Sequence, residues 1–86
     1  MTNQNKLTME AFMKTITEFQ ERKALRVTKI KGGERFVNRA VSIGLAPGSH
    51  VEIVNNRKNR PLLVYSRDTM IALNHKECEN IFVEEV

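Results

Sequence analysis

Two residues with the chemistry of metal ligands, His75 and Cys78, stand three positions apart. On one helical turn they would share a face, and zinc and iron both accept imidazole and thiolate ligands. The pair supplies half of a tetrahedral site, so the rest must come from His50, from a carboxylate such as Glu77 or Glu79, or from a second chain. The candidate cofactor is a divalent Fe or Zn ion. The simpler interpretation, which we favour, is a buried apolar Cys78 and a surface His75.

The same pair is the only candidate for nucleophilic catalysis. Cys78 would need a base and an oxyanion donor, and His75 is the only base near it in the sequence. Gly32 and Gly33 precede a predicted helix, where a phosphate can bind, but the full phosphate-loop pattern is absent and the two glycines indicate a turn. We therefore predict that the protein is not an enzyme.

The formal net charge of +4 is unevenly distributed along the chain. Residues 22–67 hold eleven Lys and Arg against two acids, whereas residues 68–86 hold one Lys against five acids. This distribution favours an acidic partner or head-to-tail self-association into a homo-oligomer. A solvated surface that keeps a small domain soluble is the simpler interpretation.

The basic residues also raise the question of nucleic-acid binding, which small β-barrels achieve by stacking bases on aromatic rings beside cations. Aromatic residues are scarce, and only Tyr65 stands at a position suited to stacking. Nucleic-acid binding is therefore the weakest of the binding hypotheses. The cations concerned are Lys29, Lys31, Arg35, Arg39, Arg57, Lys58, Arg60 and Arg67.

The totals suit one small globular domain. The chain has 86 residues, of which 41% are hydrophobic and 28% charged. A single cysteine excludes an internal disulfide framework and suits a reducing compartment. No apolar run approaches the roughly 20 residues that span a bilayer, and no secretion signal is visible at the N-terminus. We expect a cytoplasmic protein without direct membrane insertion.

The N-terminal part carries a helical pattern over residues 8–21. Thr8 can cap it, and apolar residues recur at helical spacing on one face. The pattern predicts an N-terminal helical extension over residues 1–22, which packs on the domain or docks on another chain. The apolar positions are Met9, Phe12, Met13, Ile16 and Phe19.

The remainder, residues 23–86, predicts five short strands and one short inserted helix. The strands cover residues 24–30, 51–54, 62–66, 70–73 and 81–84, the helix covers 34–43, and Asn74 can cap a single helical turn. In the first strand, Leu25, Val27 and Lys29 share one face. Short strands joined by tight turns predict a mainly β fold, a small SH3-like five-stranded barrel with the inserted helix and the extra N-terminal helix.

The run from Ile43 to Gly48 forms the corner between the inserted helix and the second strand. Gly44 follows the last periodic apolar residue and suits the positive φ of a helix end, with Leu45 folding back on the last turn. Pro47 and Gly48 suit the centre of a type II turn. We expect these residues, together with Gly32 and Gly33, to shape the fold and not to take part in catalysis or binding.

Several segments in order resemble the ferrous iron transport protein A (FeoA) family. They are Val27 to Gly33, Ile43 to Val51, Met70 to Leu73 and Cys78 to Val83, and the resemblance covers about residues 24–84. It implies an SH3-like barrel and a non-enzymatic cytoplasmic accessory role in ferrous iron uptake. The implied partner is the GTP-binding domain of a FeoB-type membrane transporter. The same barrel occurs in DtxR-like metal-dependent repressors, so a metal-responsive regulatory domain is the alternative function.

The sequence departs from the family pattern at three places. Cys78 replaces an alanine, Arg60-Pro61 and Asp68 replace glycines around the third strand, and the N-terminal segment is an addition that suits docking or dimerisation. SH3-like barrels bind through loops and an exposed surface. We therefore expect the partner at the 55–60 loop and the 35–43 helix edge. The candidate partner-binding residues are Arg35, Arg39, Arg57, Lys58 and Arg60.

Overall fold

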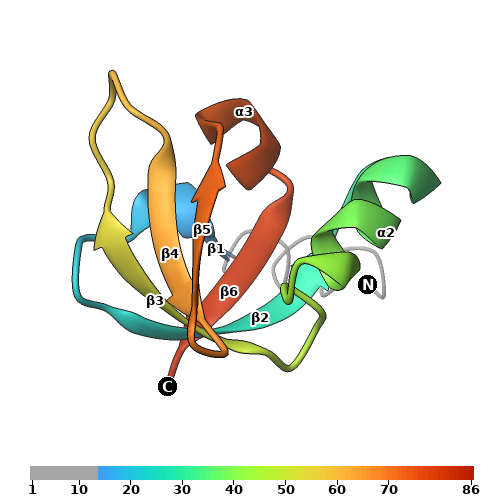
Figure 1. Cartoon of the computed structure of the whole chain (residues 1–86), viewed down its shortest axis with the longest axis horizontal. Helices are drawn as coiled ribbons and strands as arrows, with labels where there is room; N and C mark the ends of the chain where they lie inside the picture. The colour runs from blue at the N-terminus through green and yellow to red at the C-terminus, as the bar shows by residue number, and fades with distance from the viewer. Residues whose placement is uncertain (1–13) are drawn as a thin grey trace, which may run out of the picture.

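The computed structural model describes residues 14–86, which fold as one antiparallel sheet of six strands with two short α-helices (Figure 1). The strand order is β1-β6-β2-β3-β4-β5, and β1 and β5 are not paired with each other. The elements in chain order are β1 (Lys14–Thr15), the 3-10 turn η1 (Ile16–Glu18), β2 (Ala24–Ile30), α2 (Glu34–Ser42), β3 (His50–Asn55), β4 (Leu62–Ser66), β5 (Thr69–Leu73), α3 (His75–Cys78) and β6 (Ile81–Glu85).

The mainly β fold and the five predicted strands are confirmed, each within one residue at either end. The sixth strand, β1, is a two-residue addition whose Lys14 and Thr15 pair with Val83 and Phe82 of β6. No helix in residues 14–86 is long and apolar enough to cross a membrane.

The predicted helix over residues 8–21 is wrong for its second half, since residues 14–18 form β1 and η1 instead. Two of the residues predicted to form the apolar face of that helix still contact the core: Ile16 is fully buried and Phe19 packs against it. Pairing with the free edge of β6 overrides the helical pattern. Residues 8–13 of the predicted helix lie outside the described residues.

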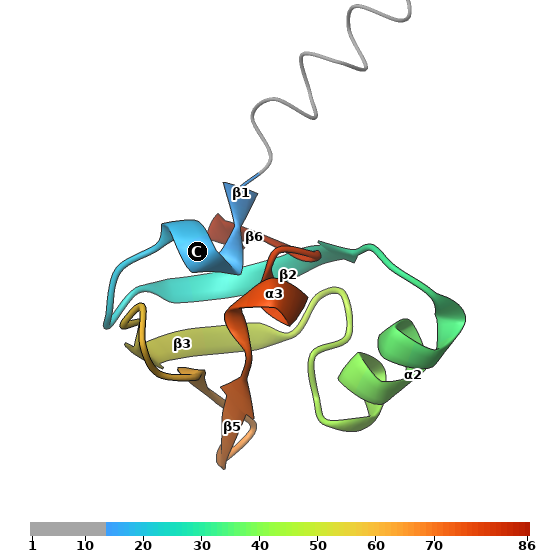
Figure 2. The same cartoon turned by 90° about the horizontal axis from the view of Figure 1, so that it is seen from above.

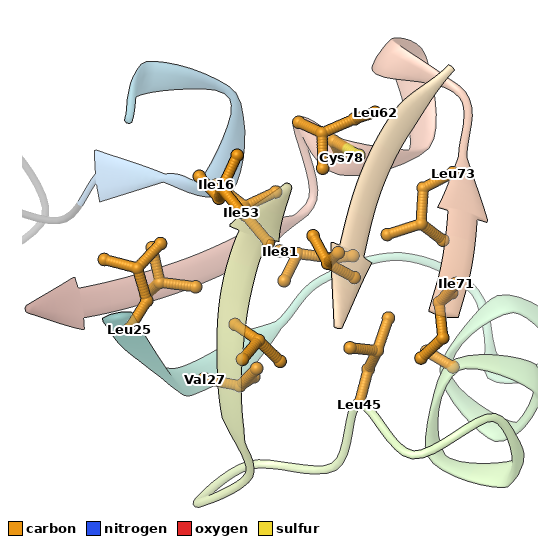
Figure 3. Close-up of a cluster of buried hydrophobic side chains, with 14 residues drawn as sticks. Ile16, Leu25, Val27, Leu45, Ile53, Leu62, Ile71, Leu73, Cys78 and Ile81 are labelled. Atoms are coloured by element: carbon orange, nitrogen blue, oxygen red, sulfur yellow. The ribbon is translucent and has the colours of Figure 1, made fainter. Parts of the chain in front are cut away.

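The core lies between the faces of the bent sheet, where the strands place alternate side chains inward (Figure 3). On β2, Leu25 and Val27 are buried and Arg26 is exposed, as expected for a half-buried strand. Lys29 is exposed, contrary to the predicted shared face, because the register with β6 shifts between Val27 and Lys29. Such a bulge reverses the inward and outward positions beyond it. The fully buried side chains are Ile16, Leu25, Val27, Leu45, Ile53, Leu62, Val64, Cys78 and Ile81.

The corner after α2 joins the helix to β3 by two local motifs. Gly44 takes φ 102°, and its N–H and that of Leu45 donate to the carbonyls of Val41 and Ala40, at 3.1 and 2.9 Å. This is a Schellman ending, and it directs Leu45 into the core. Ser49 N–H donates to Ala46 O at 2.9 Å across a turn whose Gly48 has φ 93°. Burying a leucine contributes about 2 kcal/mol, so the corner is anchored as well as turned.

The helices occupy different places around the sheet (Figure 2). Helix α2 lies to one side of the sheet. In the sequence, α2 connects β2 to β3, and α3 connects β5 to β6. The loop that joins β3 to β4 and helix α3 lie at the same end of the molecule, at the top of Figure 1. The β4–β5 hairpin lies at the opposite end, turning through Arg67 and Asp68 with φ of 51° and 61°.

Candidate partner-binding surface

Helix α3 is a single turn whose start is capped by a side chain. The Glu77 N–H donates to Asn74 Oδ1 at 2.7 Å, and Asn74 Nδ2 donates in return to Glu77 Oε1, also at 2.7 Å. The predicted Asn74 cap is thus present. The exchange satisfies a backbone donor that the helix leaves unpaired, so it fixes both the position of α3 and the direction of the Glu77 carboxylate.

His75, the first residue of α3, reaches the β3–β4 loop. Its Nε2 lies 2.9 Å from Arg57 O and 2.9 Å from Arg60 O. Both neighbours are carbonyl oxygens, which only accept, so the chemistry assigns the proton to Nε2. A nitrogen that donates a proton has no lone pair for a metal. The predicted metal candidate is therefore engaged as a structural donor at this nitrogen.

Cys78 ends α3 inside the core with no exposed surface. Burial, together with the negative charge of Glu77, raises the pKa of its thiol from 9.0 to about 12. The thiol therefore stays protonated at neutral pH, whereas both nucleophiles and metal ligands need the thiolate. His75 and Cys78 thus lie on the same short helix, but Cys78 is buried in the core whereas His75 contacts the β3–β4 loop.

The third metal candidate, His50, begins β3 and is exposed. Its carbonyl accepts from Ser66 Oγ at 2.9 Å, next to the β4–β5 hairpin. His75 contacts the loop that follows the other end of β3, about 17 Å away at roughly 3.3 Å per strand residue. Within residues 14–86, no three His, Cys, Asp or Glu side chains are grouped to hold a metal ion. His50, His75 and Cys78 do not fit a shared Fe or Zn site.

Two of the predicted partner-binding residues, Arg35 and Arg39, lie on α2 and are exposed. Arg39 is not free: its Nη2 donates to Glu77 Oε2 at 2.6 Å. Glu77 is the more buried member, with 19% of its side chain exposed against 62% for Arg39. The same carboxylate thus joins α2 to the cap of α3.

Two further ion pairs follow the same pattern. Lys23 contacts Glu85 at 3.4 Å, and Arg26 is paired with Glu84 across β2 and β6. All three pairs join the basic part of the sequence to its acidic end. Within residues 14–86, three of the five acids of the C-terminal part are thus paired with basic residues of the same chain, although Glu84 and Glu85 stay about half exposed.

The other three predicted partner-binding residues, Arg57, Lys58 and Arg60, are exposed on the β3–β4 loop. Among residues 14–86 none of them forms an ion pair with a carboxylate. Next to them lies a shallow depression of about 270 Å³, lined by Lys58, Asn59, Arg60, Pro61, Asn74 and His75. The structure thus concentrates uncompensated positive charge at one end of the sheet, beside a hollow that α3 helps to form.

Tyr65, the predicted stacking ring, is 41% exposed on β4, and its hydroxyl donates to Asp68 Oδ1 at 3.0 Å. It lies towards the hairpin end of β4, about 10 Å along the strand from Leu62, where the basic loop joins. The ring and the basic loop are therefore at opposite ends of the strand. Sequence reasoning missed the exposed neighbour of Tyr65 across the hairpin, Met70, which is 53% exposed.

Comparison with known proteins places this geometry in a family. The FeoA domain model matches residues 14–85. No curated protein matches the chain. Among solved structures, one of an iron uptake regulatory protein (FeoA) aligns with TM-score 0.77 at 19% identity, covering 87% of this chain and 99% of that one.

Two further solved structures show the range of proteins that share the fold. The FeoA of Stenotrophomonas maltophilia, solved with zinc and described as a procaryotic SH3 domain protein, aligns with TM-score 0.71 at 22% identity, covering 83% of this chain and 89% of that one. A manganese-dependent transcriptional repressor aligns with TM-score 0.79 at 14% identity, covering 87% of this chain and 42% of the repressor. These likenesses establish the SH3-like fold.

Proposed function

The chain belongs to the FeoA domain family, and on that premise we propose that it is a non-enzymatic accessory protein of ferrous iron uptake. It binds the GTP-binding domain of a FeoB-type membrane transporter and works in the cytoplasm, where that domain lies. The observation that carries the proposal is the match of the FeoA domain to residues 14–85, nearly the whole of the described chain. Iron is the cargo of the transporter in this scheme.

The surroundings of the two chemically competent side chains support a binding role. Cys78 is held as a neutral thiol in the core, and His75 donates from Nε2 to the β3–β4 loop. Neither is arranged to pass a proton to the other. What the surface offers instead is the basic loop of Arg57, Lys58 and Arg60, with Arg35 and Arg39 on α2 as a second set.

The test is a calorimetric titration of the full chain against the isolated GTP-binding domain of its transporter, with a GTP analogue and with GDP. We expect binding in at least one nucleotide state, and reduced ferrous iron uptake in a strain that lacks the protein. The proposal fails if neither nucleotide state binds and the deletion strain takes up iron normally.

A metal-responsive regulatory role is the second candidate, favoured by the zinc complex of one FeoA neighbour and by the manganese-dependent repressor. His50 is the exposed histidine on which such a role would depend. Titration with Zn(II) and Fe(II) of the wild type and of His50→Ala tests it. Tight binding that His50→Ala abolishes would support the regulatory role, and the absence of tight binding would exclude it.

A further inference from the structure

The β3–β4 loop is a closed turn that one histidine fixes from the side of α3. The Arg60 N–H donates to Arg57 O at 3.2 Å, which closes the turn. The Nε2–H of His75 then points between Arg57 O and Arg60 O at 2.9 Å from each. Arg57 O thereby uses both of its lone pairs, and the loop is held at its two basic ends.

The contact of His75 with two carbonyls of one turn restricts the conformations that the loop can adopt. A loop that is ordered before it binds loses less conformational entropy on binding.

Within four residues, the loop gathers three cations that have no carboxylate partner in residues 14–86. Within the described part of the chain, Lys23, Arg26 and Arg39 form ion pairs, whereas Arg57, Lys58 and Arg60 form none, and neither do the isolated cations of other elements, such as Lys29 and Lys31. The adjacent depression adds the Asn59 amide as a hydrogen-bonding group. Guanidinium and ammonium groups beside this hollow are complementary to carboxylates.

The lining also favours a protein segment over a nucleic acid. Proteins bind single strands by combining cations with aromatic rings on which bases stack. No aromatic residue lines this depression, and Tyr65 lies towards the other end of β4. Charge complementarity without stacking fits an acidic peptide segment.

We propose that the depression beside the β3–β4 loop is the docking site for an acidic segment of a protein partner. Arg57, Lys58 and Arg60 supply the attraction, and His75 is the positioning residue that holds the loop in its binding shape. The identity of the natural partner as the transporter's GTP-binding domain rests on the proposed function, whereas the site itself does not.

The first test uses a fluorescent octaglutamate peptide as the probe, with affinity measured by anisotropy at low salt on the full chain. The variant Lys58→Glu/Arg60→Glu is expected to bind about tenfold more weakly. The control Lys29→Glu/Lys31→Glu changes the net charge equally at the end of β2 and is expected to stay within about twofold of the wild type. An equal loss in both variants would show that only net charge matters and would overturn the proposal. So would tighter, loop-dependent binding of a single-stranded oligonucleotide.

The second test isolates His75. The side-chain amide of glutamine carries two N–H groups, which can serve the two carbonyls that the imidazole now serves. His75→Gln is therefore expected to keep the peptide affinity within about twofold, and His75→Ala to lose about fivefold, with thermal unfolding measured on both. Equal affinities in all three proteins, or an equal loss in both variants, would overturn the positioning role.

Repeating the titrations with the transporter domain separates this site from the proposed function. If the domain fails to bind while the peptide binds in a loop-dependent way, the proposed function is contradicted and the docking site is supported. If the domain binds the wild type and Lys58→Glu/Arg60→Glu equally well, the docking site is contradicted and the proposed function is supported.

Discussion

Arg39 and Glu77, 38 positions apart in the sequence, are joined by a hydrogen bond of 2.6 Å between Nη2 and Oε2. The same carboxylate accepts from Asn74 through its other oxygen, and His75, two residues before Glu77, donates to the β3–β4 loop. Helix α3 thus connects the two elements from which partner binding was expected, α2 and the basic loop. One short turn of helix, whose Cys78 is buried and whose His75 is bonded to the loop, contacts both of these surfaces.

The Arg39–Glu77 pair is expected to contribute modestly to stability. In a double-mutant cycle with Arg39→Ala and Glu77→Gln, we expect a coupling free energy of about 0.2–1 kcal/mol, because Arg39 is largely exposed. The coupling should shrink in 1 M salt. Urea denaturation measures it. Arg35→Ala on the same helix is the matched control, and a loss as large as that of Arg39→Ala would contradict the assignment.

Removing the cap of α3 is expected to cost more. Asn74→Ala leaves the Glu77 N–H without its acceptor and should lower the free energy of unfolding by about 0.5–2 kcal/mol. Asn74→Ser keeps an oxygen able to cap and should retain most of the stability. Chemical denaturation of the three proteins tests this, and equal losses in the two variants would mean that the cap is not the cause.

The buried thiol predicts a pH dependence. The folded pKa of Cys78 is raised from 9.0 to about 12, so the unfolded chain loses this proton at lower pH than the folded one. Its contribution is fully present below pH 9.0 and declines as pH rises towards about 12. Alkaline pH also affects the stability of a protein through its other ionisable groups, so the quantity to measure is the stability difference between wild type and Cys78→Ala. That difference should change between these limits, and a flat difference would contradict the burial.

The same burial predicts slow thiol chemistry. An alkylating reagent should modify Cys78 slowly in the native protein and rapidly in denaturant at the same pH, because attack requires an accessible thiolate. Mass spectrometry over time gives the two rates. Comparable rates would place the thiol at the surface.

Two glycines are expected to respond oppositely to the same substitution. Gly44→Ser forces a side chain into φ 102° and should cost about 1–2 kcal/mol. Gly33, the N-cap of α2, has φ −69°, and a Cβ added there would meet no atom within 4 Å, so Gly33→Ser should stabilise by about 0.5 kcal/mol. Thermal unfolding of both variants checks the signs, and a loss at both positions would contradict the cap geometry.

The sequence alone determined the local parts of this protein. Alternation located the strands, and Gly44 followed by Leu45 marked the end of α2, because backbone conformation and inward-facing positions depend on neighbours a few residues away. The family resemblance rested on the same local motifs. The helical pattern that includes Ile16 failed because a free strand edge, far away in the sequence, offered a competing partner.

Only the tertiary structure decided how the candidate site is used. Cys78 is unreactive because strands distant in the sequence enclose it, and Arg39 is paired because the fold brings α2 to α3. His75 donates a hydrogen bond to a loop that lies 15 to 18 residues before it. Charge and hydrogen-bonding capacity belong to the residue type, whereas burial and choice of partner are set by contacts between segments that the sequence does not place side by side.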